Sequence, residues 1–233
     1  MPTATYEERR SQLETYFDRT AVEAWSRLTS DAPVSRIRAT VRAGRDQMRA
    51  TLLGWLPADM RGMRLLDAGC GTGALSVEAA RRGAHVTAVD LSQTLVDLGR
   101  ERSPRDLGDG RIEFMVGDML DPALGRFDYV VGMDSLIHYR PQDTVRVLSG
   151  LVQRTRCAVL FTFAPRTPAL TLMHAVGRFF PRGDRAPSIE PVSEATLRAL
   201  IGAEPQLAGW SALRTARIDS GFYMSQALEL AHA

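Results

Sequence analysis

The chain has 233 residues, of which 45% are hydrophobic and 24% charged, so it has the balance of a folded domain and is not disordered throughout. The net charge of +2 is too small to indicate a nucleic-acid-binding protein. Only two cysteines are present, which excludes a disulfide scaffold and a multi-cysteine metal site. Every basic side chain other than His is Arg, so lysine chemistry is excluded and acidic groups must be recognised by guanidinium groups.

No apolar run reaches the roughly 18 residues that a membrane-spanning helix needs. Residues 1–10 are polar and charged, unlike a secretory signal. The sequence therefore predicts a cytoplasmic protein without a transmembrane segment. Weak peripheral association with a membrane, through the apolar stretch 170–180, is the alternative.

The first 60 residues have the pattern of helices. Apolar residues recur at helical spacing over residues 6–20 and 35–56, and Pro33 marks a break between the two runs. We interpret residues 1–60 as an N-terminal helical extension. It is either a fixed cap on the domain that follows or a lid over its site.

Residues 61–165 alternate between strand-like and helix-like segments. The predicted strands are residues 63–66, 85–89, 112–116, 127–132 and 157–163, and the predicted helices are residues 74–82, 92–102 and 143–154. Such alternation predicts parallel strands joined by helical crossovers, in a doubly wound α/β sheet.

The last part of the chain adds an insertion and a hairpin. Residues 168–180 are apolar and predicted to be helical, residues 181–191 are proline-rich, and residues 193–201 form a further predicted helix. Two final strands, at residues 213–218 and 222–230, are predicted to end the sheet as an antiparallel hairpin. We therefore expect one domain over residues 61–233, in which residues 166–191 are a substrate-side helical lid insertion after the fifth strand.

A glycine-rich loop carries the chemistry. The sequence DAGCGTG at residues 67–73 follows a predicted strand and opens a predicted helix. Its glycines let a ligand approach the backbone and present amide groups at a helix N-terminus. Because the spacing also fits G-x-G-x-x-A with Ala74, a dinucleotide-binding fold stays open at this point.

Three acidic residues stand near the ends of predicted strands. Asp67 is placed to hold a cationic amino group and Asp90 to accept both ribose hydroxyls, whereas Asp118 would receive an adenine amine, with Met119 against the ring. The simpler alternatives are a helix cap for Asp90 and a turn for Asp118. Ligands of open α/β sheets bind at the carboxyl ends of strands, which favours the binding roles.

The pattern over residues 63–163 resembles the class I S-adenosylmethionine-dependent methyltransferases. The resemblance implies a Rossmann-like sheet of seven strands with the last strand antiparallel, and S-adenosylmethionine as methyl donor. The residues that would bind the donor are Asp67, Gly69, Gly71, Gly73, Asp90, Leu91, Asp118 and Met119.

The outer segments resemble one branch of that superfamily, the magnesium-protoporphyrin IX O-methyltransferases. They are YFDRT (16–20), VRAGR (41–45), LGWL (53–56), SLIHY (135–139), TFAPRT (162–167), FFP (179–181) and GFY (221–223). This resemblance implies methyl transfer to a propionate carboxylate of magnesium protoporphyrin IX, a step of chlorophyll or bacteriochlorophyll biosynthesis. The magnesium would arrive with the porphyrin, and no protein-bound metal is expected.

The resemblance also implies the substrate-side residues. His138 would orient the reacting carboxylate or take a stray proton, and Tyr16 would donate its hydroxyl to the same carboxylate. A structural histidine and a packing tyrosine are the alternatives. Arg166 is predicted to bind the second propionate. Met173, Phe179 and Phe180 are predicted either to floor a flat apolar pocket or to belong to the core.

Three other functions stay open on the sequence. One is methylation of another flat molecule, such as a phenol or quinone. The second is an NAD-dependent oxidoreductase built on the same loop, against which Asp67 and Asp118 argue. The third is a binding protein that carries the porphyrin. An enzyme with an anionic, hydrophobic product would also be expected to contact the magnesium-inserting chelatase for hand-off.

Overall fold

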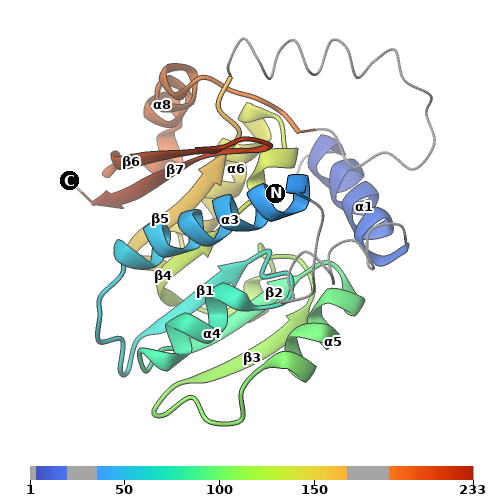
Figure 1. Cartoon of the computed structure of the whole chain (residues 1–233). Helices are drawn as coiled ribbons and strands as arrows, with labels where there is room; N and C mark the ends of the chain where they lie inside the picture. The colour runs from blue at the N-terminus through green and yellow to red at the C-terminus, as the bar shows by residue number, and fades with distance from the viewer. Residues whose placement is uncertain (1–3, 20–35, 167–188, 233) are drawn as a thin grey trace.

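The computed structural model describes residues 4–19, 36–166 and 189–232 (Figure 1). Seven strands form one sheet in the order β3-β2-β1-β4-β5-β7-β6. The first five strands pair in parallel, and β7 is antiparallel to both β5 and β6. The predicted seven-stranded doubly wound sheet with an antiparallel last strand is therefore confirmed.

The strands are β1 (Arg64–Ala68), β2 (His85–Asp90), β3 (Arg111–Val116), β4 (Phe127–Gly132), β5 (Thr155–Phe163), β6 (Trp210–Ser220) and β7 (Tyr223–His232). The helices are α1 (Ala4–Arg19), α3 (Arg36–Gly54), α4 (Ala74–Arg81), α5 (Gln93–Arg102), α6 (Pro141–Val152) and α8 (Glu194–Ala203), with 3-10 turns η1 (Pro122–Leu124), η2 (Leu136–His138) and η3 (Pro205–Leu207). The hairpin strands are longer than the sequence pattern predicts, because hydrogen-bonded pairing continues past their apolar residues. The helix predicted for residues 168–180 lies outside the described residues.

Local sequence signals explain where several helices begin. Ser92 accepts a hydrogen bond from the Leu95 amide at the start of α5, and Ser193 does the same for Thr196 at the start of α8. Pro141 opens α6, where its missing N–H costs nothing. These caps fix the ends of the crossovers that return the chain to the sheet.

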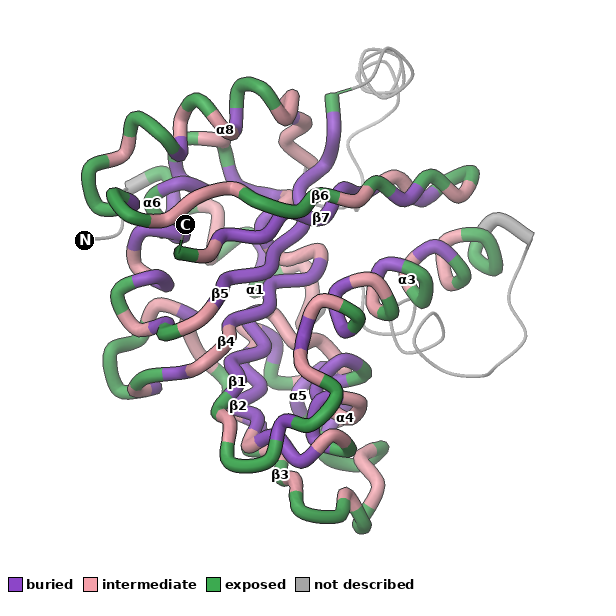
Figure 2. The backbone as a smooth tube through the Cα atoms, turned by 90° about the vertical axis from the view of Figure 1, so that its left-hand side faces the viewer, coloured by how far each residue is buried: buried purple, intermediate pink, exposed green. Residues whose placement is uncertain are grey.

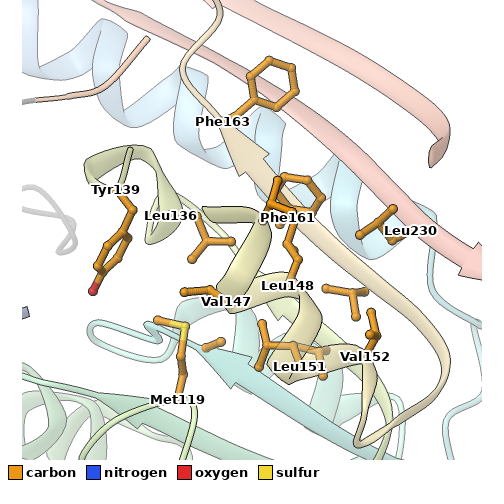
Figure 3. Packing of buried hydrophobic residues seen from close by; sticks show 14 of the residues in the cluster. Met119, Leu136, Tyr139, Val147, Leu148, Leu151, Val152, Phe161, Phe163 and Leu230 are labelled. Carbon is orange, nitrogen blue, oxygen red and sulfur yellow. The ribbon is translucent and has the colours of Figure 1, made fainter. Parts of the chain in front are cut away.

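Helices cover both faces of the sheet. Helices α3, α4 and α5 pack on one face, where Met48 and Leu52 meet the strand residues Leu65 and Leu160. On the other face, α6 and α8 pack against β4, β5 and β7, and Figure 3 shows Leu148 of α6 beside Phe161 of β5. The inner strands β1, β4, β5 and β7 are mainly buried, as the purple tube of Figure 2 shows, whereas the edge strands β3 and β6 are partly exposed.

The two N-terminal helices occupy different places. Helix α3 lies on the sheet face and runs beside the β6–β7 hairpin, where a Cβ on Gly44 would stand 2.5 Å from the Tyr223 ring. Helix α1 lies away from α3 and contacts α5 (Figure 1). Its Asp18 carboxylate accepts hydrogen bonds from Ser92 Oγ, at 2.6 Å, and from the Thr94 amide. The division of the chain at residue 60 and the movement of this segment as a lid stay predictions.

Candidate functional site

A cavity of about 290 Å³ opens where the order of the strands reverses, between the carboxyl ends of β1 and β4. Open α/β sheets bind ligands at this place because the crossovers leave to opposite faces and separate the loops. The lining comes from the glycine loop, from the ends of β2 and β4, and from α1 and α3. The sequence analysis places its ligand at the same edge of the sheet.

The glycine loop approaches the neighbouring strand end closely. A Cβ on Gly69 would stand 2.4 Å from the Ser135 Cβ, so only glycine fits beside the loop that follows β4. Around Gly71 the space is open, and its amide donates to Asp90 Oδ2 at 2.8 Å. Ser135 Oγ is buried and has no hydrogen-bond partner among the described residues. The glycine loop therefore presents backbone to the cavity, and a buried, unsatisfied hydroxyl lies in the neighbouring loop after β4.

Asp67 is a buried carboxyl group in the wall of this cavity. It is 2% exposed, and Ser76 Oγ donates to its Oδ2 at 2.6 Å. Burial raises the pKa of Asp67 to about 7, and the nearby charge of Asp90 adds to the rise, while the bond from Ser76 opposes it. A cation brought into the cavity would lower this pKa, so the site favours a positively charged ligand group.

Asp90 ends β2 and also lines the cavity. Its two carboxylate oxygens accept the amides of Gly71, at 2.8 Å, and Ser92, at 3.0 Å. Burial raises the pKa of Asp90, although these backbone amides pull it the other way. Leu91 lines the cavity beside it. Asp90 thus braces the glycine loop as well as facing the predicted ribose site.

Asp118 lies at the rim, where α1 holds it. Tyr6 donates its hydroxyl to Asp118 Oδ1 at 2.7 Å, and Arg10 Nη1 lies 2.8 Å from Oδ2. Gly117 and Met119, on either side, line the cavity, whereas Asp118 does not. Its predicted bond to an adenine amine therefore stays a prediction, and the structure adds a bond to α1.

His138 lies in η2 and lines the cavity with 9% of its surface exposed. The ring of Phe17 meets it edge-on, with centroids 6.2 Å apart. Tyr16 packs edge-on against Phe17 at 5.2 Å and does not itself line the cavity. The structure thus brings His138 into the site directly and Tyr16 to its second layer, behind Phe17.

The remaining substrate-side predictions fall elsewhere. Arg166 is exposed and does not line the cavity, and its backbone amide donates to the Val192 carbonyl at 3.0 Å. Met173, Phe179 and Phe180 lie outside the described residues. Within the described part of the chain, no group of three or more His, Cys, Asp or Glu side chains is placed to hold a metal ion.

Several lining residues were missed by the sequence analysis. They are Leu13 and Phe17 from α1, Arg42, Arg45 and Arg49 from α3, and Asp134 and Ser135 after β4. The arginines recur at helical spacing in the sequence, a signal that could have identified a basic helix face. No comparable pattern marks Asp134.

Asp134 is the most heavily bonded acid of the site. Its oxygens accept hydrogen bonds from Tyr223 at 3.0 Å and Ser225 at 3.2 Å, and it pairs with Arg45 at 2.8 Å. Its φ of +57° lies in the left-handed region, which costs free energy in a residue with a side chain. These partners tie α3 to β7 at the end of β4.

Two protein-family models match the chain. The model of the magnesium-protoporphyrin IX methyltransferase C-terminus matches residues 132–232, and a methyltransferase-domain model matches residues 65–156. The first covers the end of β4, η2 and the C-terminal hairpin, and the second covers the glycine loop and the sheet around it.

Relatives match over nearly the whole chain. The magnesium-protoporphyrin O-methyltransferase of Rhodobacter capsulatus is 50% identical over 225 residues, which are 96% of this chain and 97% of the relative. Its namesake from Synechocystis is 31% identical over 92% of both chains. A crystal structure of magnesium protoporphyrin IX methyltransferase from Synechocystis PCC 6803 with bound SAH matches with a TM-score of 0.83 at 29% identity, covering 96% of this chain and 100% of that chain.

The raised pKa of Asp67 predicts how the stability of the ligand-free protein depends on pH. Because the pKa is raised from 3.8 to about 7 on folding, this group contributes most at low pH, and its contribution is lost as the pH rises toward 7. Asp67→Asn removes the ionisable group, so the variant does not lose this stability as the pH rises. The variant should gain about 1.4 kcal/mol per pH unit relative to wild type between pH 5 and 7, and no more above that range.

Urea unfolding of both proteins at pH 5, 6, 7 and 8 measures this difference. Taking the difference cancels the titration of the shared acids that lie far from Asp67. A difference that does not change with pH would contradict the prediction.

Proposed function

Because the chain belongs to the magnesium-protoporphyrin O-methyltransferase family, we propose that it transfers a methyl group from S-adenosylmethionine to one propionate carboxylate of magnesium protoporphyrin IX. The product is the monomethyl ester, and the step belongs to chlorophyll or bacteriochlorophyll biosynthesis. The observation that carries the proposal is one cavity lined by the glycine loop with Asp67 and Asp90 on one side and by His138 on another. Family membership sets aside the NAD-dependent alternative.

The donor-binding residues fit a ligand that carries positive charge and a ribose. S-adenosylmethionine supplies an electrophilic methyl group. Asp67 is placed to hold the ammonium group, since a cation relieves the cost of its buried charge. Asp90, with Leu91 beside it, is placed to accept the ribose hydroxyls. Gly71 borders open space, whereas Gly69 and Gly73 leave room for Ser135 and for the Phe114 ring, so the loop packs closely and the donor could approach its backbone. Met119, with Asp118 at the rim, would contact the adenine.

The acceptor needs orientation more than activation. A propionic acid has a pKa near that of Glu, about 4.3, so the carboxylate is already ionised at neutral pH. His138 orients this carboxylate toward the donor in our proposal, and Tyr16, packed behind Phe17, supports the same region. Correct placement alone supplies up to roughly 7–11 kcal/mol of a reaction barrier.

Apolar lining residues exclude water from a reaction in which opposite charges disappear. Leu13 and Phe17 contribute this lining from α1, and Met119 and Met133 contribute it from the loops that follow β3 and β4. We propose that residues 166–191, with Met173, Phe179 and Phe180, complete the porphyrin pocket.

Within the part of the chain that the structure describes, no helix is long and apolar enough to cross a membrane.

We also propose that the protein receives the porphyrin directly from the magnesium-inserting chelatase. We propose in addition that it is cytoplasmic and contacts the membrane surface weakly. The chemistry of the substrate supports the hand-off, because a flat apolar macrocycle with ionised side chains is poorly accommodated by water alone.

A transfer assay tests the proposed function. Purified protein receives radiolabelled S-adenosylmethionine with magnesium protoporphyrin IX or, in parallel, with metal-free protoporphyrin. We expect label in a base-labile porphyrin monoester, and more of it with the magnesium form. Donor binding without transfer to either porphyrin would reject the substrate, and a phenol or quinone acceptor would then be tried.

Asp90→Asn should weaken binding of S-adenosylhomocysteine by about ten- to a hundredfold, because charge-assisted hydrogen bonds are worth roughly 1.5–3 kcal/mol each. Calorimetry on the purified variant measures the affinity. Asp97→Asn, an exposed acid on the neighbouring helix α5, serves as the matched control. Equal affinity in wild type and Asp90→Asn would remove Asp90 from the donor site.

His138→Ala should lower kcat on the order of a hundredfold through lost orientation of the carboxylate, while the affinity for S-adenosylhomocysteine stays unchanged. His138→Gln keeps most of the volume against Phe17 and separates packing from chemistry. If both variants keep the wild-type kcat, another group positions the acceptor.

A further inference from the structure

A row of guanidinium groups on α3 forms one wall of the cavity. Arg42, Arg45 and Arg49 are separated by three and four residues, so they share a helix face, and all three line the cavity. Asp46 is the one acidic residue of α3. Arg49 pairs with Asp46 at 2.7 Å and Arg45 pairs with Asp134, so two of the three guanidinium groups already have a carboxylate beside them. Guanidinium groups on such a wall are suited to bind a ligand's carboxylate.

The middle arginine of this row is fixed to the sheet. Arg45 Nη1 lies 2.8 Å from Asp134 Oδ2, and the Asp134 side chain is only 6% exposed. Tyr223 and Ser225 hold the same carboxylate. Because Arg45 is anchored there, the positions of Arg42 and Arg49 along the cavity wall are set by the helix.

The direction of α3 decides which of Arg42 and Arg49 lies nearer the tip of the β6–β7 hairpin. Near its N-terminus, Thr40 lies beside Gly221, at the tip of the hairpin and beyond the carboxyl ends of the strands. At its other end, the Leu53 carbonyl accepts a hydrogen bond from Arg82, which follows α4. At 1.5 Å per residue, Arg42 lies roughly 10 Å from Arg49 along the helix axis, on the side of the hairpin tip.

We propose that Arg42 is a specificity-determining residue that receives the second, unmethylated propionate of the porphyrin. This inference rests on the proposed function. The acceptor has two propionates on one edge of the macrocycle, and while one reacts beside His138 the other stays ionised. A carboxylate taken out of water needs a charged partner, and a guanidinium fork supplies two parallel hydrogen bonds. Arg166, which the sequence suggested for this carboxylate, lies outside the cavity lining.

A substrate comparison tests the assignment. The substrates are magnesium protoporphyrin IX and an analogue in which an ethyl group replaces the second propionate. Arg42→Gln should lower kcat/KM for the diacid by roughly ten- to a hundredfold, mainly through KM, and leave kcat/KM for the analogue at its wild-type value. Arg81→Gln is the matched control, because Arg81 is an exposed helical arginine paired with Glu78 outside the cavity.

Four outcomes would overturn the inference. Equal losses on both substrates would place Arg42 at the reacting carboxylate or in the fold. Weaker binding of S-adenosylhomocysteine in Arg42→Gln would assign Arg42 to the carboxylate of the donor. A diacid-specific loss in Arg166→Gln but not in Arg42→Gln would restore the assignment made from the sequence. No loss in Arg42→Gln on either substrate would leave Arg42 without a role.

The wild-type protein separates this inference from the proposed function. If wild type does not methylate the diacid, the proposed function fails and the inference falls with it. If wild type methylates the diacid and one of the four outcomes above follows, only the role of Arg42 fails.

Discussion

The reversal of strand order between β1 and β4 is the constraint on which the site depends. The two strands are neighbours in the sheet, yet the crossovers that follow β1 and β4 pack on opposite faces. The loops after the strands must therefore diverge, and the space between them cannot be filled by either helical layer. The glycine loop and the Ser135 segment meet across this space at a distance that only Gly69 allows.

The two buried acids at this crevice lower the stability of the ligand-free protein and favour binding of a cation. Asp67 and Asp90 lie where burial raises their pKa values, so the ligand-free protein bears the cost of two desolvated carboxyl groups. Hydrogen bonds from Ser76 and from backbone amides offset part of that cost and hold both side chains in fixed positions. A cationic ligand would offset more of this desolvation cost, so the two buried acids favour a positively charged ligand over a neutral one.

The N-terminal helices complete what the sheet leaves open. Helix α3 is tied to the sheet by the Arg45–Asp134 pair and by the close contact of Gly44 with Tyr223, so its arginines form a fixed wall. Helix α1 packs against the core through Tyr6, Leu13 and Phe17. It is also held by polar bonds to Asp118 and from Ser92 to its own Asp18.

The sequence alone predicted a doubly wound α/β sheet with an antiparallel C-terminal hairpin, and it predicted the glycine loop with Asp67 and Asp90. Those features follow from local patterns, which are apolar strands of about six residues, capped helices and closely spaced glycines between a strand and a helix. Its motifs also indicated the family, and His138 lies in the cavity where they placed it.

The other features of the site follow from packing between elements that lie far apart in the sequence. The bond of Asp118 to α1 joins residues more than a hundred positions apart. The lining role of Asp134 depends on Arg45 of α3 and on Tyr223 and Ser225 of β7, which converge on it from two elements. The positions of Tyr16 behind Phe17 and of Arg166 outside the cavity likewise depend on how α1 and the end of β5 pack. Sequence patterns describe the periodicity of one element at a time, whereas such contacts are fixed by the packing of several elements at once.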